Sequence, residues 1–150
     1  MDPHSLFSPP VSSFLQESIF LVFIFYLEQG GIVYSCGTAK KGALGLYDAT
    51  TAKKPEKVSQ ISKIIKIACG NAHSVALASD GKVYSWGDPA EGALGHGELN
   101  YSEKLQARQG SPRLMDHNYI SRCRFIDVAA GHTHTALLSG IFKILLFLQS

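Results

Sequence analysis

The sequence has little excess charge of either sign. Its 150 residues include 14 Lys and Arg against 12 Asp and Glu, a formal net charge of +2. That excess is too small to indicate nucleic acid or a membrane surface as a partner. Charged residues make up only 17% of the chain and hydrophobic residues 45%. These proportions exclude wholesale disorder and indicate a single folded domain.

Cysteine is also scarce. The three cysteines, Cys36, Cys69 and Cys123, are 33 and 54 residues apart. An odd number at such spacings fits neither a disulfide framework nor a CxxC zinc knuckle. We therefore expect free thiols in a reducing compartment, and an intracellular protein, cytoplasmic or nuclear, that is not secreted.

Long hydrophobic runs are missing as well. The apolar run at residues 19–27 has nine residues, whereas a membrane-spanning helix needs roughly 20. A secretory signal is disfavoured because residues 1–16 contain no Lys or Arg. Abundant Ile, Val and Phe favour a buried strand instead. We expect a degenerate strand within residues 14–30 and a disordered tail over residues 1–13. A membrane partner is disfavoured, and membrane association through residues 14–27 stays a third alternative.

What the sequence does contain is an internal repeat. At an offset of 50 residues, the segment GIVYSCG that begins at Gly31 recurs as GKVYSWG at Gly81, and GALG at Gly42 recurs at Gly92. At an offset of 61, IACGNAHS, which begins at Ile67, recurs as VAAGHTHT. Periods near 50 residues are typical of propeller blades.

The repeated unit has the signals of a hairpin. Residues 73–78 and 82–86 flank Asp80-Gly81, a pair that is typical of a two-residue type I′ turn. In the second of these strands Tyr84 and Trp86 are two residues apart, so they share one face. The sequence therefore predicts that Trp86, at the end of a half-buried strand, is itself buried.

Two further strands per unit complete a blade. Residues 64–69 and 125–130 are expected to alternate between two faces as strands do. Short runs after Pro55 and Pro112 supply outer strands, because proline is tolerated at a strand start or edge. Four short antiparallel strands per unit predict an all-β fold, a partial β-propeller built of four-stranded blades.

The repeat breaks at both ends. At the offset of 50, residues 23–27 fall on the first hairpin strand but lack its histidine. At the offset of 61, residues 141–146 fall on the turn and the YSWG block and replace them with an apolar run. We therefore assign propeller-type repeats to residues 31–140 and an apolar end, which replaces the next repeat, to residues 141–150.

These motifs resemble the repeat of the regulator of chromosome condensation family. That repeat combines a Gly-x-Val-Tyr-Ser-Trp-Gly strand, a Gly-x-Leu-Gly-x-Gly loop, a Pro-led outer strand and a Gly-x-x-His-Ser/Thr-x-Ala-Leu strand. The matching segments are residues 81–87, 92–97 and 70–77 within a resemblance that covers about residues 30–140. The departures are Cys36 in place of Trp, Tyr47 in place of Gly and Leu137 in place of Ala.

The resemblance implies blades of a seven-bladed propeller, of which this chain contains only two to three. A propeller buries the faces of each blade against its neighbours, so an open run leaves two terminal faces exposed. We therefore expect a fragment of a longer protein, and self-association of the isolated chain through its exposed blade faces.

His73 and His134 recur at equivalent positions, each three residues after a glycine. A catalytic residue need not recur in each blade, so the recurrence favours support of a turn. We expect no metal and no cofactor. The GALGHG loop at Gly92 lacks the Gly-Lys-Ser/Thr ending of a phosphate loop. A triad of Ser74, His73 and Asp80 is excluded because adjacent strand residues point to opposite faces.

The charge pattern marks two candidate contact regions. Residues 40–66 hold seven lysines against two acids, a local balance of +5. A basic loop can contact an acidic protein or DNA phosphate, whereas lysines without interleaved aromatics are usually a solvated face. The partner-binding candidates are Lys40, Lys41, Lys53 and Lys54. The sixteen-residue loop 96–111 is the second region, because specific contacts concentrate in loops on a rigid scaffold.

The sequence therefore predicts a protein-interaction scaffold, with blades as support and loops as contacts, and no enzyme. The alternative that the resemblance implies is a regulator or guanine-nucleotide exchange factor for a Ran-type small GTPase. In either case the partner is a protein, and a small GTPase is one candidate. No nucleic-acid partner is clearly indicated.

Overall fold

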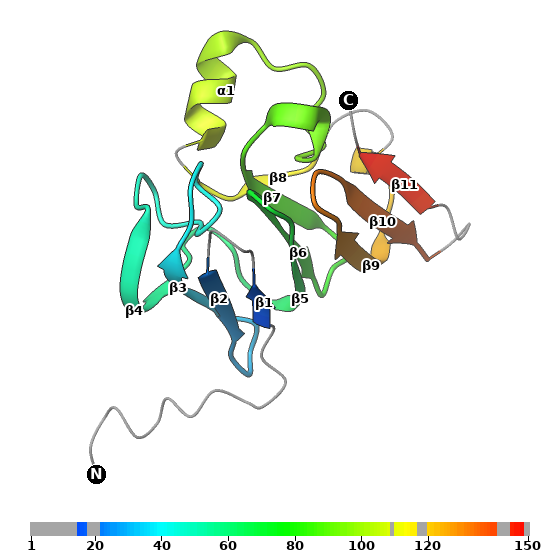
Figure 1. Ribbon diagram of the computed structural model, residues 1–150. Coiled ribbons are helices and arrows are strands. Elements are labelled where there is room, and N and C mark those ends of the chain that lie inside the picture. Colours follow the sequence, from blue (N-terminus) through cyan, green and yellow to red (C-terminus); the bar gives the residue numbers. More distant parts are fainter. Residues whose placement is uncertain (1–14, 18–21, 109, 117–119, 141–144, 149–150) are drawn as a thin grey trace.

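Three antiparallel sheets lie side by side in the computed structural model, which describes residues 15–17, 22–108, 110–116, 120–140 and 145–148 (Figure 1). The elements are β1 (Leu15–Glu17), β2 (Val22–Leu27), β3 (Val33–Thr38), β4 (Thr51–Lys57), β5 (Ile64–Cys69), β6 (His73–Ala78), β7 (Val83–Gly87), α1 (Tyr101–Arg108), β8 (Arg113–Leu114), β9 (Phe125–Ala130), β10 (Thr135–Ser139) and β11 (Leu145–Leu148).

Each sheet is a simple meander of strands in chain order. Sheet A has the order β1-β2-β3-β4, sheet B the order β5-β6-β7-β8, and sheet C the order β11-β10-β9. All pairs are antiparallel. The predicted all-β, partial β-propeller is confirmed, with two four-stranded blades and a third sheet of three described strands.

The middle sheet is buried on both faces. All six residues of β6 are buried, and they alternate between two separate cores. Ala76 and Ala78 pack into the core shared with sheet A, while Val75 and Leu77 pack into the core shared with sheet C. This period of two is what a strand imposes on its side chains. Sheet B therefore holds the other two sheets in place.

The GALG loops connect neighbouring sheets through their backbone carbonyls. The carbonyl of Ala43 accepts a hydrogen bond from Ser74 Oγ of sheet B at 2.8 Å and one from Trp86 Nε1 at 3.0 Å. The carbonyl of Ala93 accepts one from Thr135 Oγ1 of sheet C at 2.7 Å. Since Ser74 and Thr135 are equivalent in the repeat, the same inter-sheet bond is made twice.

A hydroxyl of each loop's own sheet holds the same loop from the other side. Ser35 Oγ donates to the Leu44 carbonyl at 2.7 Å, and its repeat equivalent Ser85 donates to the Leu94 carbonyl at 2.6 Å. These serines are fully buried, so each bond satisfies polar groups that would otherwise be costly to bury. The loops are thus fixed both to their own sheet and to the next one.

The alternation predicted for the inner strands is interrupted by a bulge. In β5 the register shifts between Ile64 and Lys66, and in β9 the equivalent shift leaves Ile126 as the extra residue. An extra residue in one strand re-aims its side chain. Ile65 and Ile126 are accordingly 56% and 59% exposed, although the simple alternation placed Ile65 with the buried Ile67.

The hairpin turn also differs from the expected type I′. The structure gives positive φ to Gly81 but not to Asp80. Gly81 N donates to Ala78 O, and Ala78 N donates to Lys82 O. This is the three-residue hairpin in which a type I turn is followed by a left-handed glycine. A type I′ turn needs positive φ at both central residues, and here only Gly81 has it. The prediction of a type I′ turn is therefore wrong.

The outer strands lie close to where proline suggested. Arg113–Leu114 forms β8 directly after Pro112, as predicted. In sheet A, however, β4 starts at Thr51 and contains Pro55, which does not begin the strand. The register between β3 and β4 shifts between Ser35 and Gly37, which accommodates Pro55. Proline has no backbone N–H to donate, and a bulge on an edge strand does not need one.

The two ends of the repeat region also form strands. β2 occupies the first hairpin position of sheet A, where it pairs with β3, and β11 occupies the second hairpin position of sheet C, where it pairs with β10. The predicted tail at residues 1–13 and part of the apolar end lie outside the described residues. Among the residues that the structure describes, no helix is long and apolar enough to cross a membrane.

The predicted burial of Trp86 is confirmed, and the side chain lies between sheets A and B. It is 1% exposed and meets the ring of Phe25 edge to face, with 5.8 Å between ring centroids. A Cβ on Gly45 would lie 2.8 Å from Trp86 Nε1. The glycine, with a φ of +73°, therefore lets the loop turn and also leaves room for the indole.

Replacing Trp86 with alanine should destabilise the protein by about 3 to 5 kcal/mol, because a cavity forms between two sheets. Trp86→Phe should cost less, since it keeps ring packing and loses only the bond to Ala43 O. Trp86 is the only tryptophan, so both variants lose the tryptophan fluorescence signal. Urea unfolding is therefore followed by far-UV circular dichroism. Tyr101→Ala, at an exposed site, is the control. An unchanged midpoint for Trp86→Ala would contradict this packing.

Candidate functional site

His73, the first of the two recurrent histidines, belongs to the inter-sheet contacts. His73 on β6 is buried and its Nε2 lies 3.0 Å from Thr135 Oγ1 on β10. Thr135 gives its single hydroxyl proton to Ala93 O. The imidazole must therefore donate its Nε2 proton to the threonine oxygen. His73 is a neutral donor that connects sheet B to sheet C.

Burial also keeps His73 neutral. It lowers the pKa of the imidazole from 6.5 to about 4, and the nearby His134 and His132 charges act in the same direction. A backbone hydrogen bond at His134 and the charge of Asp88 oppose this shift but do not cancel it. A neutral, enclosed imidazole between two sheets fits the structural role that recurrence indicated.

The glycine three residues earlier makes space for each ring. A Cβ on Gly70 would overlap the imidazole of His73, and one on Gly131 would overlap that of His134. The backbone N–H of each glycine donates to the carbonyl of its histidine, at 2.8 and 2.9 Å. The Gly-x-x-His spacing is thus explained by a tight turn on which the ring packs.

One serine–histidine contact looks catalytic but is not. Ser85 Oγ lies 3.1 Å from His96 Nε2, but the serine proton is already donated to Leu94 O. His96 must therefore donate to the serine oxygen, which is opposite to the direction that general-base activation needs. Ser35 makes the same carbonyl bond with Leu46 in the place of His96. In both copies the serine therefore holds the GALG loop through a hydrogen bond to its backbone carbonyl.

The predicted loop 96–111 contains a helix, α1, which was not expected. Asn100 Oδ1 accepts from Glu103 N and Glu103 Oε2 accepts from Asn100 N, both at 2.9 Å. This reciprocal pair is a capping box, with Asn in the place of Ser or Thr. The Asn-x-x-Glu spacing was present in the sequence and was the signal that could have predicted the helix start.

The segment after α1 is anchored on sheet A. A Cβ on Gly110 would lie 2.5 Å from the carbonyl oxygen of Gly42. The inserted segment therefore leaves sheet B, forms α1 and returns across the first GALG loop before β8 begins. It is supported by two sheets.

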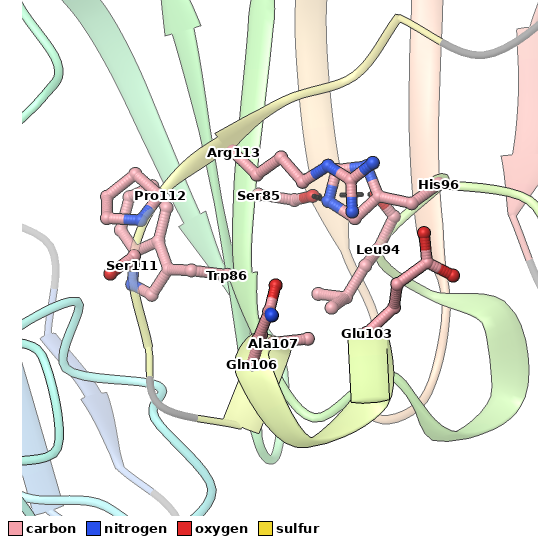
Figure 2. A pocket seen from close by; sticks show the side chains of 10 residues that line it. All are labelled: Ser85, Trp86, Leu94, His96, Glu103, Gln106, Ala107, Ser111, Pro112 and Arg113. Carbon is pink, nitrogen blue, oxygen red and sulfur yellow. Dashed lines mark hydrogen bonds between the residues drawn. The ribbon is translucent and has the colours of Figure 1, made fainter. Parts of the chain in front are cut away.

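A cavity of about 130 Å³ lies between α1 and sheet B. Figure 2 shows that Glu103, Gln106 and Ala107 reach it from α1, while Arg113 extends across Ser85 and His96 on the other side. The outward face of the helix carries Tyr101 and Leu105, which are 84% and 53% exposed and one helical turn apart. A second cavity, of about 250 Å³, shares Ser111 and Pro112 with the first and is lined also by Tyr47.

The four candidate lysines are all exposed, and sheet A carries all of them. Lys40 and Lys41 follow β3, and Lys53 and Lys54 belong to β4. Lys41 is bound to Asp88 of sheet B, with 2.8 Å between Nζ and Oδ2. A second ion pair, Lys66 with Asp127, joins β5 to β9, and this hydrogen bond lowers the pKa of Asp127.

A polar cavity of about 220 Å³ lies where the sheets meet. It is lined by Lys41, Asp88, His73 and His132 together with neighbouring loop residues. Its charges are already paired, and in the described part of the chain no three His, Cys, Asp or Glu side chains are placed to hold a metal ion. The cavity adds no chemistry to the inter-sheet contacts.

Comparison with protein families gives a clear match. Two models described as regulator of chromosome condensation (RCC1) repeat match the chain, one at residues 30–77 and 80–138 and the other at residues 64–93.

Relatives and solved structures agree. The E3 ubiquitin-protein ligase HERC2 of Mus musculus is 36% identical over 78% of this chain and 2% of its own length. The Regulator of chromosome condensation of Xenopus laevis is 32% identical over 79% of this chain and 26% of its own. A structure of Prp20p from Saccharomyces cerevisiae, described with its binding to Gsp1p and histones, has a TM-score of 0.68, 22% identity and coverage of 83% and 30%. The chain thus spans 2% and 26% of the lengths of the two curated relatives.

His73 predicts a specific dependence of stability on pH. Its pKa is about 4 when folded and 6.5 when free, so the unfolded state binds the proton more tightly. The stabilisation is complete above pH 6.5 and is lost as the pH falls towards 4, by about 3 kcal/mol. In His73→Gln, whose amide can still donate to Thr135, this part of the pH dependence should disappear. Urea unfolding between these pH values measures it.

The matched control is His132→Gln, the same change at an exposed histidine. It should retain most of the pH dependence of the parent, because the charge of His132 is the smallest contribution to the lowered pKa of His73. Equal slopes for the parent and His73→Gln would mean that folding does not lower the pKa of the ring.

Proposed function

Because this chain belongs to the regulator of chromosome condensation repeat family, we propose that it is a protein-interaction module that binds its partner through α1 and the neighbouring cavity. Family membership supports a repeat-based interaction or regulatory role. The observation that carries the proposal is the pair Tyr101 and Leu105, exposed one turn apart on a helix that packs on sheet B and is followed by Gly110 against the first GALG loop.

The rigidity of the support favours this position. The GALG loops on both sides of sheet B are bonded to their own sheet and to the next. The inserted segment that carries α1 rests on one of these loops at Gly42. A helix held in this way loses little freedom on binding, which lowers the entropic cost of recognition.

The surface favours a partner segment with an apolar side chain next to basic ones. Tyrosine and leucine side chains give an apolar contact area. Residues 88–116 contain five acids against three bases, a balance of −2. The cavity beside the helix, at about 130 Å³, has room for a single small side chain. We therefore propose an apolar anchor flanked by Lys or Arg as the recognised chemistry.

Tyr101→Ser combined with Leu105→Ser should weaken partner binding at least about tenfold, because exposed aromatic and aliphatic anchors contribute most of the energy of such contacts. The parent and the double variant are used side by side to capture proteins quantitatively. A captured partner is then purified and titrated against both by calorimetry.

The matched control is Ile65→Ser combined with Ile126→Ser, which removes two exposed apolar side chains from the inner strands. It should bind like the parent. If the control loses the partner and the α1 variant keeps it, the inner strands form the interface and the proposal is wrong.

The lysines are proposed as a secondary contact for an acidic surface. Lys40, Lys53 and Lys54 are exposed, whereas Lys41 is paired with Asp88. Lys53→Glu with Lys54→Glu should reduce binding of an acidic partner in low salt and have little effect in high salt. We also propose an intracellular location, cytoplasmic or nuclear. This accords with three free cysteines, of which Cys69 has its pKa raised by burial to about 12.

Regulation of a Ran-type small GTPase is the second candidate, favoured by the likeness to Prp20p, which is described with Gsp1p. Exchange requires a surface that binds the nucleotide-free GTPase better than the loaded form. Three sheets offer a small part of such a surface, and the chain covers 30% of Prp20p.

The isolated chain should therefore not accelerate nucleotide release. Release of a fluorescent guanine nucleotide from a Ran-type GTPase measures this, with full-length Regulator of chromosome condensation as the positive control. Acceleration by the 150-residue chain would make this candidate the function and displace the α1 proposal.

A further inference from the structure

Two exposed isoleucines stand at equivalent positions of the inner strands. Ile65 on β5 and Ile126 on β9 are separated by 61 residues, the offset of the repeat, and are 56% and 59% exposed. The register of each strand shifts at this residue, so a bulge re-aims its side chain. Sheet B packs against a core on both of its faces. The exposure of Ile65 is therefore built into the strand and does not come from an open blade face.

The two isoleucines lie on strands that are side by side at the boundary between sheets B and C. The residues that follow them, Lys66 and Asp127, form an ion pair that joins β5 to β9. A Cβ on Gly140 would lie 2.8 Å from Cγ2 of Ile126, so this glycine leaves room for the isoleucine side chain. Single exposed apolar residues are common on soluble proteins, whereas grouped ones mark contact surfaces. The paired bulges therefore indicate an apolar contact at this boundary.

A cation lies two residues before each isoleucine. Lys63 precedes β5 and Arg124 precedes β9, and both side chains are exposed. The turn between β6 and β7 lies between these two residues. Ser79 N donates to Lys63 O at 2.9 Å, and on the other side Arg124 Nε donates to Asp80 O at 3.0 Å. The turn itself carries the exposed Lys82, so three cations surround one turn.

Asp80 is the acid of this turn, and its carboxylate contacts Lys82. Oδ1 accepts a hydrogen bond from Lys82 N at 3.0 Å, and Oδ2 lies 3.8 Å from Lys82 Nζ. An exposed ion pair of this kind is weak, so Lys82 can pair with another carboxylate. The bond from Arg124 Nε to the turn orients the guanidinium group, whose two terminal nitrogens form a fork that fits a carboxylate. Three cations against one acid leave a surplus of positive charge.

The backbone of Lys63 gives an independent reason to expect a use for its side chain. Lys63 has a φ of +54°, in the left-handed region. A residue with a Cβ adopts this conformation at a higher cost than glycine does. Residues kept in such conformations concentrate at functional sites. A lysine at a position that suits glycine better therefore favours a role for its ammonium group.

We propose that this end of sheets B and C is a second interaction surface, which binds an acidic peptide segment that carries aliphatic side chains. The surface, called the turn surface below, consists of the two bulge isoleucines and the three cations: Lys63, Ile65, Lys82, Arg124 and Ile126. The isoleucines contact the aliphatic side chains of the segment. The cations pair with its Asp and Glu side chains, so the two charge patterns are complementary.

The composition of the turn surface favours a peptide over nucleic acid. Binding of a single strand uses aromatic side chains on which the bases stack. Among the residues that the structure describes, the exposed aromatic side chains are Tyr47 and Tyr101, which lie after β3 and on α1. Isoleucine offers no such stacking surface, but it packs well against the aliphatic side chains of a peptide.

The turn surface is distinct from the α1 surface. The turn precedes β7, whereas α1 follows the loop at the other end of this strand. The α1 surface is proposed to bind a basic partner, so the two surfaces recognise opposite charge and either proposal can fail alone. A basic partner that depends on Ile65 and Ile126 would contradict the α1 proposal, whereas an acidic partner that depends on them belongs to the turn surface.

Fluorescence anisotropy with a labelled peptide of repeated Glu-Leu-Asp units measures binding to the 150-residue chain. Lys63→Gln combined with Arg124→Gln should weaken this binding at least about tenfold, and so should Ile65→Ser combined with Ile126→Ser. A peptide of repeated Glu-Ala-Asp units keeps the charge but loses the larger aliphatic side chains, and it should bind the parent more weakly.

The matched control is Lys57→Gln combined with Lys104→Gln, which makes the same change of net charge at two exposed lysines on β4 and α1. It should bind the Glu-Leu-Asp peptide like the parent. An equal loss of affinity in this control would mean that the peptide responds only to net charge.

Hydrogen exchange of the parent protein locates the peptide without any substitution. Amide protection in residues 63–66 and 124–127 should rise when the Glu-Leu-Asp peptide is added, while that of α1 should not change. Four results would overturn the inference: no binding of this peptide by the parent, an equal loss in the control variant, tighter binding of duplex DNA than of the peptide, or unchanged exchange of these two segments. Should a variant fail to fold, the exchange of the parent decides alone.

Discussion

The carbonyl group of Ala43 accepts hydrogen bonds from two side chains of the neighbouring sheet, Ser74 and Trp86. The equivalent carbonyl of Ala93 accepts one from Thr135, whose hydroxyl oxygen in turn accepts a hydrogen bond from Nε2 of His73. These bonds fix the distance between sheets in a way that apolar packing alone does not, because hydrogen bonds are directional and a buried, unpaired carbonyl is costly. The position of each sheet relative to the next depends on them.

Several features of the sequence are consequences of this one contact. A GALG loop has to turn tightly and also lie against an indole, which Gly45 allows. The hydroxyl residue after each histidine must face the preceding sheet or loop, while the histidine faces the following one. β6 achieves both because its side chains alternate, so that Ser74 points to sheet A and His73 to sheet C. A pattern that could suggest a triad is thus the pattern of a strand between two cores.

The proposed contact surface lies where the two copies of the repeat differ. The two copies share the hydrogen bonds of their GALG loops. They differ in the length of the connection to the outer strand, where α1 is inserted in the second copy. They also differ at the end of the chain, where an uncharged strand takes the place of the third blade strand. The insertion exposes an apolar helix face, Tyr101 and Leu105, for which the first copy has no counterpart.

The sequence by itself determined the repeat, its inner and hairpin strands, the structural role of His73 and the burial of Trp86. These follow from local rules, since strands alternate every two residues and glycine is required where a turn or an aromatic ring leaves no room. It also contained the Asn100–Glu103 capping box, although the connection was interpreted as a loop.

Only the tertiary structure decided the rest. The bulges that expose Ile65 and Ile126 arise from pairing with β6 and β10. The pairing of Lys41 with Asp88 joins residues 47 positions apart. The proton direction between His96 and Ser85 depends on where the Leu94 carbonyl lies. Each of these depends on which groups meet across sheets, and a local pattern does not contain that information.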